Sequence, residues 1–181
     1  MTCTEDRLMI KSRPHRNEVF MTVALTFSLM STCARRRVGC VLVDGMGNVM
    51  ATGYNGPARG VTHCIDSPCP GAGMKSGEGL ASCQAIHAEQ NALLQCRDVN
   101  MIDKVYCTTA PCEHCVKLLM NTGATTIYFL HTYPKSNESR GLWLSSRSSR
   151  KWINYDQEMI IRADAQSPSK VMDAIVGSYG I

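Results

Sequence analysis

The chain has 181 residues, of which 44% are hydrophobic and 19% charged, and its formal net charge is +4. This composition is ordinary for a globular protein, so we expect one domain over residues 1–181. No dense Lys/Arg stripe interleaved with aromatic residues occurs, which argues against nucleic acid as a partner. Residues 1–13 show no secretory signal and no apolar run reaches membrane-spanning length, so we expect a soluble, cytoplasmic protein with no membrane partner.

Hydrophobic periodicity predicts the N-terminal elements. Residues 14–30 predict an amphipathic helix, in which Val19, Val23, Phe27 and Met30, with Phe20, Ala24 and Leu25 beside them, recur at helical spacing. A β-branched run at 38–43, a turn and a second strand at 49–53 predict a hairpin. A loop rich in Gly, Pro, Ser and Cys then covers residues 56–79, and loops of this length are usually functional or pinned.

Helices and strands alternate in the middle of the chain. We predict a helix at 87–96, a strand at 104–109, a helix at 112–121 and a strand at 125–130. This order implies parallel neighbouring strands with helices on the faces of the sheet.

The signal weakens after Tyr133. Residues 145–150 predict a loop or a frayed helix end, and 158–162 an edge strand or a helical turn. Residues 174–181 predict a loosely held tail. We therefore predict no helix or strand firmly in residues 136–181, and no second domain.

Two short motifs carry the chemistry: His87-Ala-Glu89 and Pro111-Cys112-Glu-His-Cys115. Together they form the H-x-E and P-C-x-x-C pattern of zinc-dependent nucleobase deaminases. We expect His87, Cys112 and Cys115 to bind a catalytic zinc ion, because three protein ligands leave a fourth position open for water. Glu89 is then the candidate catalytic residue that carries protons. Each pair opens a predicted helix after a predicted strand, so the zinc should lie between two helix N-termini, at the ends of neighbouring strands.

Two other interpretations of these motifs stay open. The zinc site could be closed and structural, with His114 or Cys107 as a fourth ligand and Glu89 as a solvated helix residue. The chain could also be a catalytically inactive zinc scaffold that binds nucleotides as a sensor. The carboxylate of Glu89 argues against a scaffold, which has no need for it.

The motifs resemble the deoxycytidylate (dCMP) deaminase family, within the cytidine deaminase superfamily, over residues 18–135. The resemblance also rests on Thr32–Gly39, Gly53-Tyr-Asn-Gly56, His63-Cys64 and Thr132-Tyr133. It implies a three-layer α/β/α fold around a mixed sheet of about five strands. It also implies hydrolytic deamination of dCMP to dUMP for thymidylate synthesis, in a homohexamer that dCTP activates and dTTP inhibits.

The resemblance suggests four substrate-binding residues. Asn55 matches an asparagine that hydrogen-bonds the sugar, although a turn residue is an alternative, and Tyr133 matches a tyrosine beside the substrate, although an aromatic at the core edge is an alternative. The backbone at Ala88 and Thr109 is expected to contact the base. The phosphate is not assigned; its candidates are the cationic residues Arg35, Arg36, Arg37, Arg59 and Lys117.

A second, structural zinc is predicted near the long loop. The candidate ligands are Cys33, Cys64, Cys69 and Cys83, and a zinc ion would pin a segment with few apolar residues. The family resemblance supports Cys33 and Cys64 most directly, and His63 could replace one of the others. Free thiols packed as small apolar groups are the alternative.

Other deaminase substrates are the remaining alternatives. They are tRNA adenosine, free cytosine, cytidine, a riboflavin precursor and a modified nucleotide such as 5-hydroxymethyl-dCMP. A polynucleotide deaminase needs stacking aromatic residues along a positive channel, and only 6% of this chain is aromatic.

Overall fold

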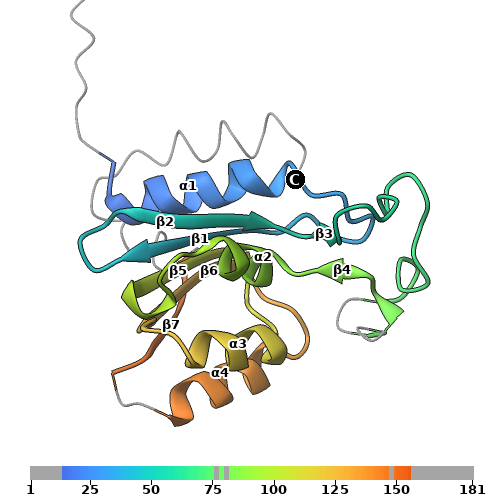
Figure 1. Ribbon diagram of the computed structural model, residues 1–181. Coiled ribbons are helices and arrows are strands. Elements are labelled where there is room, and N and C mark those ends of the chain that lie inside the picture. Colours follow the sequence, from blue (N-terminus) through green and yellow to red (C-terminus); the bar gives the residue numbers. More distant parts are fainter. Residues whose placement is uncertain (1–13, 76–77, 80–81, 147–148, 156–181) are drawn as a thin grey trace, which may run out of the picture.

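The fold is built on a five-stranded mixed sheet with the strand order β2-β1-β5-β6-β7 (Figure 1). The computed structural model describes residues 14–75, 78–79, 82–146 and 149–155. The strands are β1 (Gly39–Asp44), β2 (Val49–Tyr54), β5 (Ile102–Thr109), β6 (Thr126–His131) and β7 (Lys151–Asn154). β1 is antiparallel to both β2 and β5, whereas β5, β6 and β7 are parallel. The predicted mixed sheet is therefore confirmed.

Helices cover both faces of this sheet and make three layers. α1 (Arg16–Ser28) lies on one face. α2 (Ala88–Gln95), α3 (Glu113–Met120) and α4 (Ser136–Ser145) lie on the other face (Figure 1). A 3₁₀ turn, η2 (Val99–Met101), precedes β5. In the described part of the chain, no helix is long and apolar enough to cross a membrane.

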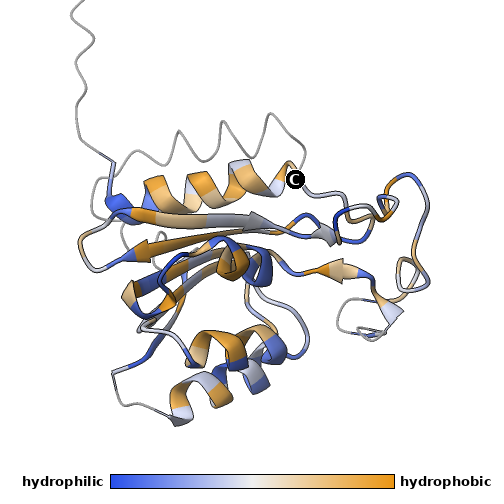
Figure 2. Cartoon of the chain, viewed as in Figure 1, coloured by the Kyte–Doolittle hydropathy of each residue, from blue (hydrophilic) through white to orange (hydrophobic). Residues whose placement is uncertain are grey.

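Alternation along the strands divides the core into two clusters. In β1, Val41 packs with α1, while Cys40 and Leu42 face the side of α2, α3 and α4. β5 repeats the pattern, with Tyr106 toward α1 and Val105 toward the opposite face. Successive side chains in a strand point to opposite faces, so strands that are buried on both sides are apolar throughout. Figure 2 shows this as a nearly continuous apolar colour along β1.

The apolar face predicted for the first helix is confirmed only in part: Ala24 and Leu25 are buried, whereas Val19 and Met30 are not. The residues of α1 that are buried against the sheet are centred on Met21, Ala24 and Leu25. Val19 is 44% exposed and Met30 lies beyond the helix end at 55% exposed. Apolar residues occur all around this helix, so periodicity could not identify the buried face.

A small ladder interrupts the segment predicted as one long loop. β3 (Gly56–Pro57) pairs antiparallel with β4 (Ala85–Ile86), and the chain between them forms an irregular extension at the side of the molecule (Figure 1). β4 leads into α2. The strand before α2 therefore belongs to this ladder, and is not a neighbour of β5 in the main sheet as the sequence suggested.

Two elements lie in residues 136–181, for which we predicted no firm helix or strand. α4 and β7 complete a parallel β-α-β-α-β run from β5 to β7. Trp143 of α4 is fully buried, and its indole N–H donates to the Lys151 carbonyl of β7 at 3.0 Å. The segments 158–162 and 174–181 lie outside the described residues.

Candidate metal centre and active-site cavity

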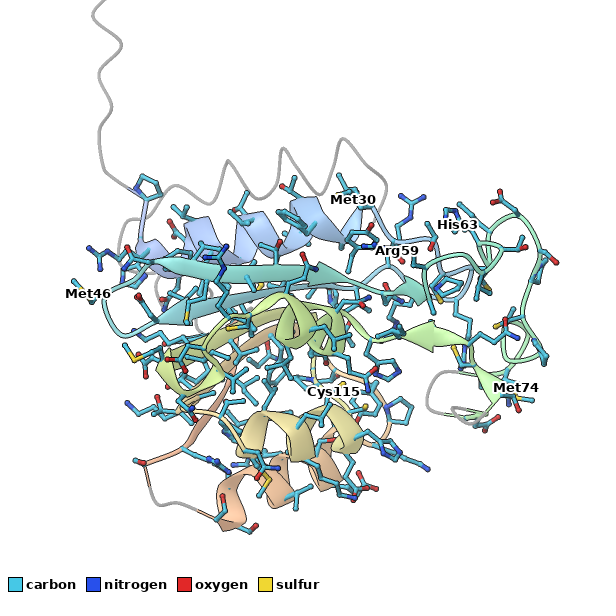
Figure 3. The ribbon with its side chains drawn as sticks, viewed as in Figure 1. Met30, Met46, Arg59, His63, Met74 and Cys115 are labelled. Atoms are coloured by element: carbon cyan, nitrogen blue, oxygen red, sulfur yellow. The ribbon has the colours of Figure 1, made fainter. Side chains whose placement is uncertain are left out.

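Three ligand atoms meet between the N-termini of α2 and α3. His87 Nδ1 lies 3.4 Å from Cys112 Sγ and 3.4 Å from Cys115 Sγ. All three atoms lie within 4.8 Å of one another, and no other His, Cys, Asp or Glu of the described residues joins them. Figure 3 shows Cys115 between α3 and the sheet. The predicted ligands are therefore brought together.

The spacing of these atoms suits a tetrahedral zinc ion. With Zn–S bonds of about 2.3 Å and Zn–N bonds of about 2.0 Å, tetrahedral angles separate sulfur and nitrogen by about 3.5 Å. The two observed separations are close to that value. Two thiols and one imidazole are also a donor set that zinc prefers. The residues present fit the ion.

The fourth ligands considered for a closed site do not join this group. His114 is exposed on α3. Cys107 is fully buried, and its sulfur lies 3.6 Å from that of Cys40 across the β1–β5 pair. Within the described chain, the centre keeps three protein ligands, as a catalytic site does.

Close packing of α2 on β2 fixes the position of His87. A Cβ atom at Gly53 of β2 would lie 2.2 Å from the Ala88 carbonyl oxygen and 2.5 Å from the Ala92 nitrogen, so only glycine allows this contact. Asn91 donates to the Tyr54 carbonyl at 2.7 Å and ties the helix to the end of the same strand. His87 is the N-cap, with its backbone N–H donating to Gln90 Oε1.

The ligand side chains perturb one another strongly. Hydrogen bonding from Cys115, together with the bond to His87, lowers the pKa of Cys112 to about 4. The hydrogen bond to Cys112 raises the pKa of His87 to about 9, against the opposing effect of burial. The hydrogen bond to Cys112 and burial raise the pKa of Cys115. The protons on His87 and Cys115 occupy the directions that a divalent cation would take, so binding of a metal ion displaces them.

Glu89 lies beside the ligands and not on the surface. It is only 4% exposed, and burial raises the pKa of its carboxyl group. Its carboxylate accepts a hydrogen bond from the Cys115 thiol. The interpretation of Glu89 as a solvated helix residue is therefore wrong. Burial makes this carboxylate a better proton acceptor than an exposed one, which suits a residue that carries protons.

The pattern of one histidine, two cysteines and one buried glutamate is matched by a family model. The model of the cytidine and deoxycytidylate deaminase zinc-binding region covers residues 14–131. The chain belongs to this family.

Deaminases of this family from several sources are similar to the chain. The chain is 38% identical over 129 residues to the deoxycytidylate deaminase of Saccharomyces cerevisiae. That alignment covers 70% of this chain but only 41% of the yeast protein. Identity is 35% to the deoxycytidylate deaminase of Mycobacterium phage D29, covering 70% of this chain and 99% of the phage protein. Among solved structures, dCMP deaminase from the cyanophage S-TIM5 in apo form aligns with a TM-score of 0.57 and 25% identity, over 78% of this chain and 100% of that one.

A cavity of about 360 Å³ opens beside the metal centre. His87, Glu89 and Cys112 line it, and so do Ala88, Thr109 and Tyr133, which the resemblance proposed as substrate contacts. Its size falls within the range of small-ligand sites. The lining also includes apolar residues that the sequence analysis did not propose as contacts: Ala34, Val38, Ala72, Met74, Ala85 and Ala110. Ala34 and Val38 lie within the Thr32–Gly39 motif, which was the one sequence signal that pointed to this wall.

Asn55 lines the cavity and also holds its wall together. Its side-chain oxygen accepts from Ser31 Oγ at 2.7 Å and from the Val38 N–H at 2.8 Å. Its side-chain nitrogen donates to the Arg36 carbonyl at 2.8 Å. One N–H of the side-chain amide is left to donate to a ligand, in addition to these structural bonds.

Of the cationic candidates for the phosphate, Arg35 and Arg36 line the cavity. The Arg35 guanidinium donates to the carbonyls of Lys75 and Glu78 and is used to hold the loop. Within the described chain, the side chain of Arg36 has neither a hydrogen bond nor an ion pair. Lys117 is paired with Glu113 at 2.9 Å. The cavity lining includes neither this lysine nor the exposed residues Arg37 and Arg59.

The four loop cysteines approach one another only partly. Cys64 and Cys69 have their sulfurs 3.6 Å apart, and the Cys83 thiol bonds to Cys69. Cys33 is buried, and it lines the cavity together with Cys83. His63 is exposed, with Nδ1 3.8 Å from an Asp66 oxygen (Figure 3).

Proposed function

We propose that the chain catalyses the hydrolytic deamination of dCMP to dUMP with release of ammonia. The observation that supports this most directly is the cavity lined by His87, Cys112 and the buried Glu89, which opens beside the ligand group that Cys115 completes. The cyanophage protein with the same fold has been solved with dCMP and dUMP. The chain spans 41% of the Saccharomyces cerevisiae relative, so the activity of that longer protein is a proposal here.

His87, Cys112 and Cys115 would hold zinc. When bound, zinc lowers the pKa of a coordinated water toward neutrality and so makes hydroxide available. Glu89 would take one proton of that water and deliver it to the ring nitrogen beside C4 of cytosine, while the water oxygen bonds to C4. Glu89 would then move the second proton from that oxygen to the amino group, the C4–N bond breaks, ammonia leaves and the C4 carbonyl of uracil forms. Burial raises the pKa of Glu89, which makes its carboxylate a better proton acceptor than an exposed one.

We propose that Arg36 binds the 5′-phosphate. It is the cavity-lining cation whose side chain is not engaged elsewhere in the described structure, and its backbone is fixed by the bond from Asn55. An Arg36→Gln variant should lose roughly 10- to 100-fold in kcat/KM for dCMP, because a hydrogen bond to a charged group is lost, and should act on deoxycytidine as the wild type does. Arg37→Gln is the matched control.

The remaining roles rest on the family resemblance. We propose that Ala88, Thr109, Asn55 and Tyr133 contact the substrate, and that the enzyme is a cytoplasmic homohexamer that supplies dUMP for thymidylate synthesis. We also propose activation by dCTP and inhibition by dTTP. We further propose that Cys33, Cys64, Cys69 and Cys83 bind a structural zinc ion, which would draw the partly assembled thiols together.

A substrate comparison tests the proposed activity. Ammonia release is measured with dCMP, CMP, deoxycytidine, cytosine, 5-hydroxymethyl-dCMP and a tRNA anticodon stem at equal concentration. We expect the highest kcat/KM for dCMP. Higher kcat/KM for any other compound would assign the chain to a different substrate, and no release from any of them would contradict a deaminase.

A further inference from the structure

We infer that Ser139 is a positioning residue that holds the ring of Tyr133 at the wall of the cavity, and that Tyr133 acts on the substrate through its ring and not through its hydroxyl group. Tyr133 lines the cavity together with Cys112 and Glu89. The inference rests on the proposed function, because it assigns a role within the nucleotide cavity.

A short hydrogen bond joins the two side chains. The Tyr133 hydroxyl lies 2.6 Å from Ser139 Oγ, and Ser139 is fully buried. Ser139 Oγ also lies 3.4 Å from the Lys135 carbonyl oxygen, to which it donates. A serine hydroxyl has one proton, so the proton in the bond between the two hydroxyls comes from Tyr133. That proton is then not available to a bound nucleotide.

Tyr133 is also attached to α4 through its main chain. The Tyr133 carbonyl accepts the N–H of Ser136, so the tyrosine contacts the first turn of α4 by its main chain as well as its side chain. α4 is fixed in turn by Trp143, which is fully buried in the core and bonded to β7. A continuous chain of contacts therefore runs from the edge of the sheet through α4 to the cavity wall.

The arrangement leaves one kind of contact for Tyr133. With its hydroxyl proton used, the residue offers the ring, which packs partly buried against the core cluster on its other side. A fixed aromatic ring in a cavity for a pyrimidine nucleotide suits stacking or edge contact with the base. Such a contact is made equally in the ground state and in the transition state, so it should affect KM and leave kcat unchanged.

The test is a double-mutant cycle with dCMP as substrate. Tyr133→Phe and Ser139→Ala each remove the same bond, and we expect each to raise KM about fivefold with kcat unchanged within about twofold. The double variant should have the KM of the single variants, because one bond cannot be removed twice. Ser145→Ala is the matched control: Ser145 lies at the other end of α4, and its hydroxyl bonds to the Leu142 carbonyl at 2.8 Å, so this substitution should leave KM unchanged.

Three results would overturn the inference: additive effects of the two substitutions on KM, an unchanged KM for Tyr133→Phe, or a loss confined to kcat. If Ser139→Ala does not fold, Tyr133→Phe against the wild type decides by itself. If the wild type deaminates no nucleotide, the proposed function fails, and the same fivefold change is then sought in the calorimetric dissociation constant of dCMP.

Discussion

The metal centre at the helix N-termini and the cysteine cluster of the loop both gather soft ligands, but only the first is assembled by regular structure. His87 and Cys112 are N-cap residues of helices that pack on the sheet, and their ligand atoms lie at zinc spacing. Cys64 and Cys69 lie on an irregular extension and make only pairwise contacts with each other and with Cys83. At the metal centre, the fold holds the ligand side chains in place before a metal ion binds. At the loop cysteines, a zinc ion would have to order the chain as it binds.

The largest effect is expected for a substitution of Glu89, which should separate zinc binding from proton transfer at the metal centre. Glu89→Gln keeps the shape of the side chain but removes its proton exchange, so we expect kcat for dCMP to fall by about 10³-fold with zinc content unchanged. Turnover and elemental analysis are measured on the same sample. Glu113→Gln, the same change in the first turn of α3 on an exposed residue, should keep full activity. Near wild-type turnover by Glu89→Gln would refute the proton-carrier role.

Acidification should distinguish the two regions next. Cys112, with its pKa lowered to about 4, stays ionised down to that pH, so the metal centre displaces protons from His87 and Cys115 only. In the loop, burial raises the pKa of Cys83, whereas a hydrogen bond with the backbone of Gln84 lowers that of Cys69. Zinc bound by four thiols still displaces more protons than zinc at the metal centre, and each additional displaced proton makes the apparent affinity fall more steeply with pH. Between pH 8 and 5 we therefore expect the loop zinc to be released first, as measured by zinc content after dialysis. Earlier loss of the zinc bound by His87 would contradict the ranking.

A substitution at Gly53 should affect the metal centre and leave the loop intact. Gly53→Ala forces the N-terminus of α2 away from β2, because the new methyl group meets backbone atoms. We expect a loss of about 1–3 kcal/mol in stability and weaker zinc binding by His87. Gly45→Ala is the control, since nothing lies within 4 Å of its added Cβ. Equal melting temperatures for the two variants would show that α2 is not seated by this contact.

The smallest effect is expected from the loop itself. Cys64→Ser should lower zinc content from two ions to one per chain and make residues 58–84 about tenfold more sensitive to protease, because the segment loses its crosslink. Cys96→Ser, at the C-cap of α2 and outside the cluster, is the matched control. A wild type that binds one zinc ion, or a Cys64→Ser loop as resistant as that of the control, would remove the second zinc site.

The sequence predicted the parts of the site that carry local signals. His87, Glu89, Cys112 and Cys115 belong to dense motifs at helix starts, and the strands around them are short β-branched runs. α4 and β7 were not predicted, because Ser136–Ser145 is a polar helix whose position depends on Trp143 and the sheet edge. The bonds of Ser139 and Asn55 likewise join residues whose pairing depends on tertiary packing. The buried face of α1 was predicted only in part, because the helix is apolar on more than one side.

Zinc K-edge X-ray absorption on the Cys64→Ser variant shows directly whether the zinc site is open, since this variant should hold only the ion at His87. We expect two sulfur ligands at about 2.3 Å, one imidazole nitrogen and one oxygen from solvent. A third sulfur or a second imidazole in place of that oxygen would show a closed structural site, and would contradict a hydrolytic deaminase.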